Sequence, residues 1–199
     1  VFKVARDKKA KGIIFSSSAS VYGNQEGVMS ETNTTKPESP YAENKRDVEL
    51  LGKKYAEMYN FPSVHLRYFN VYGKGNHEEG SYAPVTARFI KAKKEGKLLP
   101  ITGDGTQTRD FVHVKDVAKA NVLAIKLLDT TTSPIINISS GKSISIKEIA
   151  NIIGGEIEYL PERKEIKHSL GDNTKAKELL EWEPSVFIED GIRELLHEK

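Results

Sequence analysis

GIIFSSSASVYG, residues 12–23, joins a short apolar run directly to a cluster of four serines and a tyrosine. The apolar run is typical of a buried strand in a parallel sheet. Hydroxyl groups at the end of such a strand are costly to bury unless each finds a hydrogen-bond partner. One interpretation is a serine-rich turn that caps the next element. The other is a ligand site, because ligands of parallel sheets bind beyond the carboxyl ends of the strands.

Strand-like runs and helical patterns alternate around this stretch as far as about residue 128, which predicts a parallel sheet covered by helices. The other elements predicted in this part are strands over 63–70 and 98–102 and helices over 85–95 and 115–128. The helix after the serines is predicted to begin at Pro40, with Ser39 as its cap. Its apolar side chains recur at helical spacing and are expected to face the core; they are Tyr41, Val48, Leu51, Tyr55 and Met58.

The pattern changes after the TTTSP linker at residues 130–134. The elements predicted beyond it are strands over 135–138 and 157–160, a helix opened by the capping box SIKE at 145–148, a helix capped by Asn173, and a helix from 188 to the end. These elements predict a smaller α/β lobe attached to the main sheet.

Composition excludes several classes of function. The 30 basic and 28 acidic residues are spread along the whole chain, so no nucleic-acid face is expected, and the basic run at 91–97 is interpreted as a solvated helix end. No segment has the length of a membrane span or the pattern of a targeting signal, which predicts a soluble, cytoplasmic protein. The absence of cysteine excludes disulfides, thiolate zinc sites and a cysteine nucleophile. No group of His, Asp and Glu residues has metal-ligand spacing.

YAENK, residues 41–45, places a tyrosine and a lysine four positions apart near the start of the capped helix. Residues four apart lie on one helix face, so the phenol of Tyr41 and the ammonium of Lys45 can approach the same point. A cation beside a phenol stabilises the phenolate, which is the form that a general base needs. The same spacing also arises by chance in many helices.

Two further stretches with polar groups are RYFNVYG at 67–73 and GDGTQTRDFVHVKDV at 103–117. Arg109 follows a glycine turn and can make two parallel hydrogen bonds to a phosphate. An ion pair with Asp110 or Asp104 is the alternative. His113 lies in an alternating apolar run and is interpreted as a packed structural histidine.

Four stretches in this order, FSSSASVYG, YAENK, LRYFNVYG and GDGTQTRDFVHVKDVA, resemble the extended short-chain dehydrogenase/reductases, specifically nucleotide-sugar epimerases of the UDP-glucose 4-epimerase type. The resemblance continues to AKELLEWEP at 176–184 and implies an α/β fold, the C-terminal part of a Rossmann-like parallel sheet with a smaller substrate-binding lobe. Residues 1–129 would then be the remaining part of an NAD-binding domain, with substrate-lobe excursions near 74–110. Residues 130–199 would be mainly the substrate-binding lobe.

The family's glycine-rich dinucleotide fingerprint does not match any stretch of this sequence. Gly103 to Gly105 and Gly154-Gly155 do not follow a strand and open a helix in the required way, so the resemblance implies roughly 100 further residues upstream. The chain also opens in a helical pattern, which is expected for the tail of a strand-helix unit.

The resemblance also implies roles for individual residues. Ser18 would hydrogen-bond the sugar at carbon 4, Tyr41 would exchange its proton as acid and base, and Lys45 would hold the nicotinamide ribose. The other implied cofactor contacts are Ser16, Ser17, Tyr68 and Phe69. The other implied substrate contacts are Asn70, Tyr82, Pro84, Arg109 and Arg163, although Lys164 stands where the family has a glycine after this last arginine.

The function implied is NAD-dependent 4-epimerisation of a UDP-sugar, UDP-glucose, UDP-galactose or their N-acetyl forms, through a 4-keto intermediate. A homodimer is implied for the complete protein. The alternatives are a dehydratase or decarboxylase of the same superfamily, a simple reductase, and a non-catalytic sugar-nucleotide-binding relative. A dehydratase needs acidic groups just after the serine position, whereas Ala19 and Ser20 follow Ser18 here.

Overall fold

The computed structural model describes residues 1–77, 80, 83–129, 132–163 and 166–197. Its larger part is built on a three-stranded parallel sheet in the order β1-β2-β6. The strands are β1 (Ile13–Ser18), β2 (Ser63–Tyr68) and β6 (Ile135–Ile138). Ile13 is in register with Ser63, and His65 with Ile135. Among the described strands, β1 therefore pairs on one side only.

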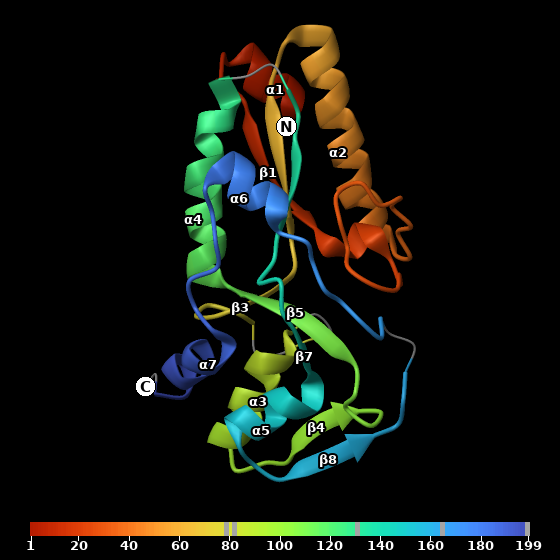
Figure 1. The fold of residues 1–199 in the computed structure, drawn as a ribbon, viewed down its shortest axis with the longest axis vertical. Coiled ribbons are helices and arrows are strands. Elements are labelled where there is room, and N and C mark those ends of the chain that lie inside the picture. The colour runs from red at the N-terminus through yellow and green to blue at the C-terminus, as the bar shows by residue number, and fades with distance from the viewer. Residues whose placement is uncertain (78–79, 81–82, 130–131, 164–165, 198–199) are drawn as a thin grey trace.

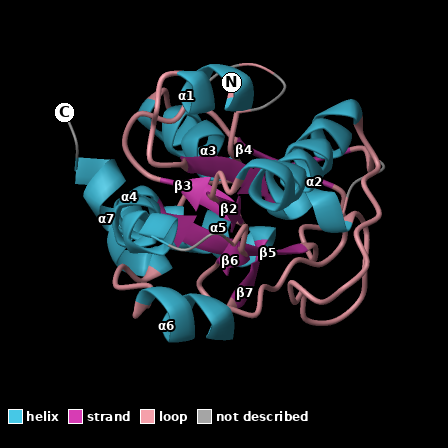
Figure 2. Cartoon of the chain, turned by 90° about the horizontal axis from the view of Figure 1, so that it is seen from above, coloured by secondary structure: helices cyan, strands magenta, loops and turns pink. Residues whose placement is uncertain are grey.

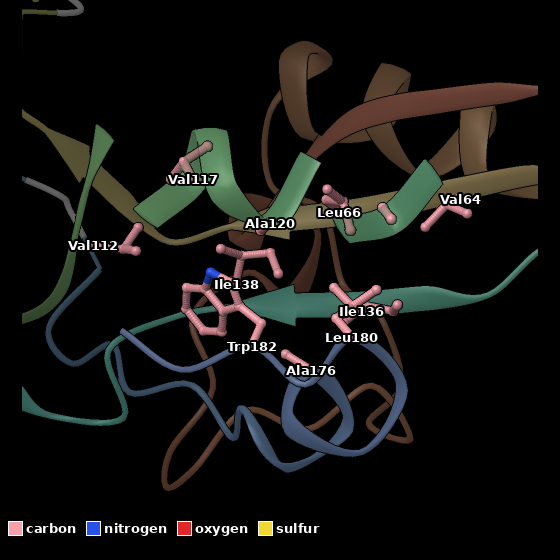
Figure 3. Packing of buried hydrophobic residues seen from close by; sticks show 11 residues of the cluster. Val64, Leu66, Val112, Val117, Ala120, Ile136, Ile138, Ala176, Leu180 and Trp182 are labelled. Atoms are coloured by element: carbon pink, nitrogen blue, oxygen red, sulfur yellow. The ribbon is translucent and has the colours of Figure 1, made fainter. Parts of the chain in front are cut away.

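The two faces of β2 differ in character because successive side chains point to opposite sides of a sheet. Val64 and Leu66 lie in an apolar core with α4 (Val114–Ala124) and α6 (Thr174–Leu180), where Trp182 is fully buried (Figure 3). The opposite face carries His65 and Arg67 and is covered by α2 (Pro40–Tyr59). Figure 2 shows α2 and α4 on opposite sides of these strands.

The start of α2 is as predicted. Pro40 is the first helical residue, and the Ser39 side chain accepts a hydrogen bond from the backbone N–H of Ala42 at 3.2 Å. A short helix, α1 (Phe2–Asp7), packs beside it, with the rings of Phe2 and Tyr55 5.1 Å apart.

The prediction of which side of α2 faces the core is wrong. Leu51 is 45% exposed and Met58 66% exposed, whereas the buried positions are Ala42, Glu49, Gly52 and Ala56. The reason is that α2 packs on the polar face of β2. Small residues allow a close approach there, and Glu49 meets the polar side chains of the strand. The larger apolar side chains are left on the outer side.

The smaller part contains two further sheets (Figure 1). One has the order β3-β5-β7, formed by β3 (Asn70–Tyr72), β5 (Thr108–His113) and β7 (Ser143–Ser145), and the other pairs β4 (Leu99–Thr102) with β8 (Ile157–Leu160). Three helices pack against them: α3 (Val85–Lys94), α5 (Ile146–Ile153) and α7 (Ile188–His197). The predicted capping box is confirmed, because Ser145 and Glu148 exchange hydrogen bonds at the start of α5.

Two elements beyond residue 130 lie with the larger part of the molecule. β6 follows that position in sequence but lies beside β2, and α6 covers it with Ala176 and Leu180. Trp182 fixes this return, since its indole Nε1 donates to the backbone oxygen of Asp116 at 2.9 Å. Asn173 occupies the N-cap position of α6, but its side chain donates instead to the Ser139 carbonyl.

Two short 3-10 helices, Ala19–Tyr22 and Ile125–Asp129, complete the described elements. None of the helices in the described part of the chain has the length and apolar character needed to cross a membrane.

Candidate active site

The three serines at the end of β1 have different partners. Ser18 caps the short helix Ala19–Tyr22, with its Oγ accepting from the backbone N–H of Ser20 at 3.2 Å. Ser17 is buried and donates to Glu49 Oε1 at 2.5 Å. The Oγ of Ser16 lies 3.3 Å from the phenol oxygen of Tyr68. Ser18 thus caps a helix, as in the interpretation of the serines as a capping turn. It also lines a cavity.

Tyr41 and Lys45 lie in the first turns of α2, beside the carboxyl end of β1. The Lys45 Nζ donates to the Ser16 carbonyl oxygen at 2.6 Å and lies 5.4 Å from the centre of the Tyr41 ring. Partial burial lowers the pKa of the Lys45 ammonium below its ordinary value. Tyr41 is 50% exposed, so its phenol is open to a ligand. The ammonium therefore lies near the Tyr41 ring, and its approach to the phenol oxygen stays a prediction.

A buried ion pair fixes α2 to the sheet beneath these residues. Arg67 donates to both carboxylate oxygens of Glu49, at 2.9 and 2.6 Å, and both side chains are 3% exposed. Burial is the largest single influence and opposes the charge of Arg67, but the hydrogen bonds and charges of Glu49 and Tyr22 together outweigh it and hold the pKa of Arg67 above its ordinary value. The guanidinium also lies 4.7 Å from the ring of Tyr22. Tyr22 in turn donates to Asn137 Oδ1 at 2.7 Å, so the network spans the sheet.

A cavity of about 230 Å³ opens at the end of β1, next to Ser18. Its other lining residues include Tyr68, Phe69, Asn70 and Arg109, four of the side chains singled out in the sequence. We refer to it as the reaction cavity. Tyr68 is held by a hydrogen bond from its phenol to Asn121 Oδ1 at 2.9 Å, and Asn70 donates to the Asp110 carbonyl at 2.9 Å.

A second cavity, of about 290 Å³, adjoins the first and shares Asn70 and Arg109 with it. Pro84 and Arg163, two further predicted substrate contacts, also line it. We refer to it as the nucleotide cavity. Asn70, Pro84, Arg109 and Arg163 thus line one cavity, and their contacts with a substrate stay predictions. Tyr82 lies outside the described residues.

Arg88, in the first turns of α3, also lines the nucleotide cavity. This residue was not predicted from the sequence. A single arginine inside a helical pattern has no motif to mark it. The only signal was its place on the helix that follows Pro84.

Arg109 is oriented by backbone carbonyls, since its Nη1 donates to the Thr108 oxygen at 2.8 Å. Among the described residues, the two aspartates considered as its ion-pair partners bind other donors. Asp104 accepts from Thr106, and Asp110 accepts from Ser140, Gly141 and Gly171. Burial raises the pKa of Asp110, against the effect of these hydrogen bonds.

His113 is buried, as predicted for a structural histidine. Its ring packs edge-on against Tyr72 with centroids 5.0 Å apart, and Nδ1 accepts from the backbone N–H of Lys115. Burial lowers its pKa. Among the described residues, no group of three or more His, Asp or Glu side chains is arranged to hold a metal ion.

A parallel sheet with a Tyr-x-x-x-Lys helix at its carboxyl edge is the arrangement expected for an extended short-chain dehydrogenase/reductase with a Rossmann-like fold. Residues 1–139 match the model of the NAD dependent epimerase/dehydratase family, and the chain belongs to this family. The resemblance found in the sequence is thereby confirmed.

Individual relatives agree with this assignment. A UDP-glucuronate 4-epimerase of Thermodesulfobacterium geofontis is 36% identical over 97% of this chain, and a putative UDP-glucose 4-epimerase of Methanocaldococcus jannaschii is 34% identical over 99%. The chain spans 60% and 66% of these two relatives. A UDP-N-acetylglucosamine 4-epimerase from Methanobrevibacter ruminantium, solved with UDP-N-acetylmuramic acid, superposes with a TM-score of 0.91 at 36% identity, over 98% of this chain and 64% of its own.

Proposed function

We propose that this chain carries the catalytic and substrate-binding residues of an NAD-dependent UDP-sugar 4-epimerase. The observation that supports it best is the continuity of the two cavities across Arg109. Ser18 lines the first and Arg163 lines the second, while Tyr41 and Lys45 line neither. Lys45 lies beside the end of β1, where it binds the Ser16 carbonyl. A sugar in the reaction cavity would therefore have its diphosphate beside an arginine. The relatives named for UDP-sugar 4-epimerases favour the same activity.

The residues of this chain suit the chemistry. Ser18 would hydrogen-bond the 4-hydroxyl of the sugar, and Tyr41 would take the proton from that oxygen as the hydride leaves carbon 4. NAD, when bound, supplies the hydride acceptor and donor. The 4-keto sugar would then turn over, and Tyr41 would return its proton as hydride is restored to the other face. Proton and hydride both come back, so no net redox change results.

The residues also fit the nicotinamide ribose of NAD. An ammonium has three N–H donors, and Lys45 Nζ donates one to the Ser16 carbonyl. The remaining two are available for ribose hydroxyls. That contact with Ser16 also holds the ammonium near the Tyr41 ring, where it would stabilise the phenolate.

Replacing Tyr41 by phenylalanine tests the proposal. Tyr41→Phe should lower kcat of the full-length protein at least about a hundredfold, the lower end for loss of general acid and base, and leave UDP-sugar affinity nearly unchanged. Tyr59→Phe is the matched control, because Tyr59 is 47% exposed at the other end of α2. Equal losses in turnover and affinity would show that Tyr41 is structural, and a Tyr41→Phe protein that still turns over would remove it from the mechanism.

The product distinguishes epimerisation from loss of water or carbon dioxide. None of the described residues lining the reaction cavity is a carboxylate, which disfavours the extra acid and base groups that a dehydratase uses. One relative is nevertheless named a UDP-N-acetyl-alpha-D-glucosaminuronate decarboxylase. NMR analysis of products from UDP-glucose, UDP-galactose and their N-acetyl forms decides, and a 4-keto-6-deoxy sugar would contradict the proposal.

The proposal includes a cytoplasmic homodimer for the complete protein. Leu50, Leu51 and Met58, on the outer side of α2, are 56%, 45% and 66% exposed, and burying them would favour association. Sedimentation equilibrium of the full-length protein tests the oligomeric state. A monomer at micromolar concentration would contradict it.

A further inference from the structure

The order of the cavities fixes where each part of a nucleotide sugar would lie. Ser18 lines the reaction cavity, so the sugar belongs there. Arg109 and Asn70 stand where the two cavities meet and would border the diphosphate. The ribose and the base must then extend through the nucleotide cavity, away from Ser18. This cavity also adjoins a surface groove, with which it shares Arg88 and Pro100, and neither of these residues lines the reaction cavity. Arg88 would therefore lie on the side of the base and not of the diphosphate.

Arg88 lacks a partner in the described part of the molecule. Its side chain is half-buried, and none of the hydrogen bonds or ion pairs found among the described residues involves its guanidinium. A guanidinium has five N–H donors and stays charged, so these donors are available to a ligand in the cavity. The side chains of Pro84, Val85 and Pro100, which line the cavity with it, carry no hydrogen-bond acceptor. The structure thus presents an unused set of donors in a cavity lined by both apolar and polar side chains.

We propose that Arg88 is a specificity-determining residue that donates hydrogen bonds to the O4 carbonyl oxygen of a uracil base. The inference rests on the proposed function, because it takes a UDP-sugar as the ligand. Apolar side chains such as Val71, Val85 and Phe111 line the cavity and suit the faces of a flat base. Of the two uracil carbonyls, O2 lies next to the ribose and O4 at the far end. The far end of the base points to Arg88.

The chemistry of position 4 separates uracil from cytosine. Uracil carries a carbonyl oxygen there, which accepts hydrogen bonds, whereas cytosine carries an amino group, which donates them. A guanidinium can only donate, so a cytosine would leave Arg88 unpaired and bring two sets of donors together. A site built to hydrogen-bond one group discriminates strongly against a ligand that lacks it.

Calorimetric titration of the 199-residue chain with UDP and with CDP tests the inference. Wild-type protein should bind UDP at least about tenfold more tightly than CDP, within the range for discrimination by arginine contacts to a base. Arg88→Ala should weaken UDP binding about tenfold and leave CDP binding nearly unchanged, so that the preference disappears. Arg88→Gln should raise CDP binding relative to Arg88→Ala, because an amide oxygen can accept from the cytosine amino group.

Lys91→Ala provides the matched control. Lys91 lies one helical turn further along α3 and lines the adjoining groove but not the nucleotide cavity. Its replacement should change neither affinity. Equal weakening of UDP and CDP in Arg88→Ala would overturn the inference, because it would mean that Arg88 acts on the phosphates through its charge. A wild-type chain that binds UDP and CDP equally would overturn it as well. If the wild-type chain binds neither nucleotide, the proposed function itself fails, which is a distinct result.

Discussion

At the scale of single residues, the Glu49–Arg67 pair determines how α2 meets the sheet. The pair is bidentate, both side chains are almost inaccessible to solvent, and Ser17 donates a further hydrogen bond to the same carboxylate. Glu49 lies one turn after Lys45 and two turns after Tyr41 on α2. The rotation of α2 about its axis, and with it the direction of both candidate catalytic side chains, therefore depends on this buried contact.

Glu49→Gln should lower the free energy of unfolding by about 3 kcal/mol or more, because it leaves the Arg67 charge buried and unpaired. Urea denaturation measures this loss. The double variant Glu49→Leu with Arg67→Met is the control and should cost less than the single one, since no uncompensated charge remains. A single variant as stable as wild type would show that the pair does not hold α2.

His65 gives the stability a dependence on pH. Its ring is fully inaccessible to solvent, and burial lowers its pKa to about 4, with Arg67 acting in the same direction and Glu49 against it. Between about pH 6.5 and pH 4 the unfolded chain takes up a proton at this ring while the folded chain does not. Stability is therefore lost as the pH falls through this window, by at most about 3 kcal/mol.

Urea denaturation at pH 7 and pH 5 measures this contribution. His65→Gln should lose less stability between the two pH values than wild type, whatever its stability at pH 7. His197→Gln, at the exposed end of α7, should behave as wild type. The same pH dependence in His65→Gln and wild type would mean that other groups cause it.

At the scale of elements, the close packing of α2 on β2 depends on Gly52. A Cβ atom there would lie 2.2 Å from His65 Nε2 and 2.6 Å from Ser63 Oγ. Glycine inside a helix costs about 1 kcal/mol relative to alanine, but overpacking costs about 1 to 3 kcal/mol. The clash involves a ring held in a packed interface, so the overpacking cost should exceed the gain in helix propensity.

Gly52→Ala should therefore lower the melting temperature, in contrast to the usual effect of this change in a helix. Thermal unfolding followed by circular dichroism measures it. Lys53→Ala, at the next and exposed position of α2, is the control and should change little. A more stable Gly52→Ala protein would show that α2 can move away from the strand at no cost.

Local signals in the sequence predicted the ends of elements well and their orientation poorly. Ser39 and Pro40 mark the start of α2, and Ser145 with Glu148 marks that of α5, because caps act within one turn. The side of α2 that faces the sheet depends on β2, which lies 20 residues or so further on and presents His65 and Arg67 to it. Hydrophobicity along the helix carries no information about that surface.

The candidate site likewise contains residues that the sequence could identify and a residue that it could not. Ser18, Tyr41, Lys45 and Arg109 could be named from ordered stretches and their spacing. In the structure Ser18 and Arg109 line the reaction cavity, and Lys45 lies near the Tyr41 ring and binds the carbonyl of Ser16. Arg88 could not be identified from the sequence, because its place in the nucleotide cavity results from the packing of α3 near β4. Only the assembled fold brings Arg88 and Pro100 to one wall.

At the scale of the whole molecule, the contacts for the two ligands are distributed unequally over the chain. The nucleotide cavity is lined by residues of β3, β4, β5, α3 and α5 together with Arg163. For NAD, the proposed contacts of this chain are those with the ribose near Lys45. A dinucleotide phosphate would need a glycine turn that opens a helix. The two candidate turns do not open one, because Gly103 to Gly105 joins β4 to β5 and Gly154-Gly155 joins α5 to β8.

The 199-residue chain should therefore bind UDP without NAD and bind NAD more weakly than UDP. Calorimetric titration with each ligand separately measures both affinities. Arg109→Ala should weaken UDP binding by about 1.5 to 3 kcal/mol, the value of a hydrogen bond to a charged group, and leave NAD binding unchanged. Lys91→Ala, outside the nucleotide cavity, should alter neither affinity. Tighter binding of NAD than of UDP would contradict this division of the molecule, and an Arg109→Ala chain with wild-type affinity for UDP would remove Arg109 from the diphosphate site.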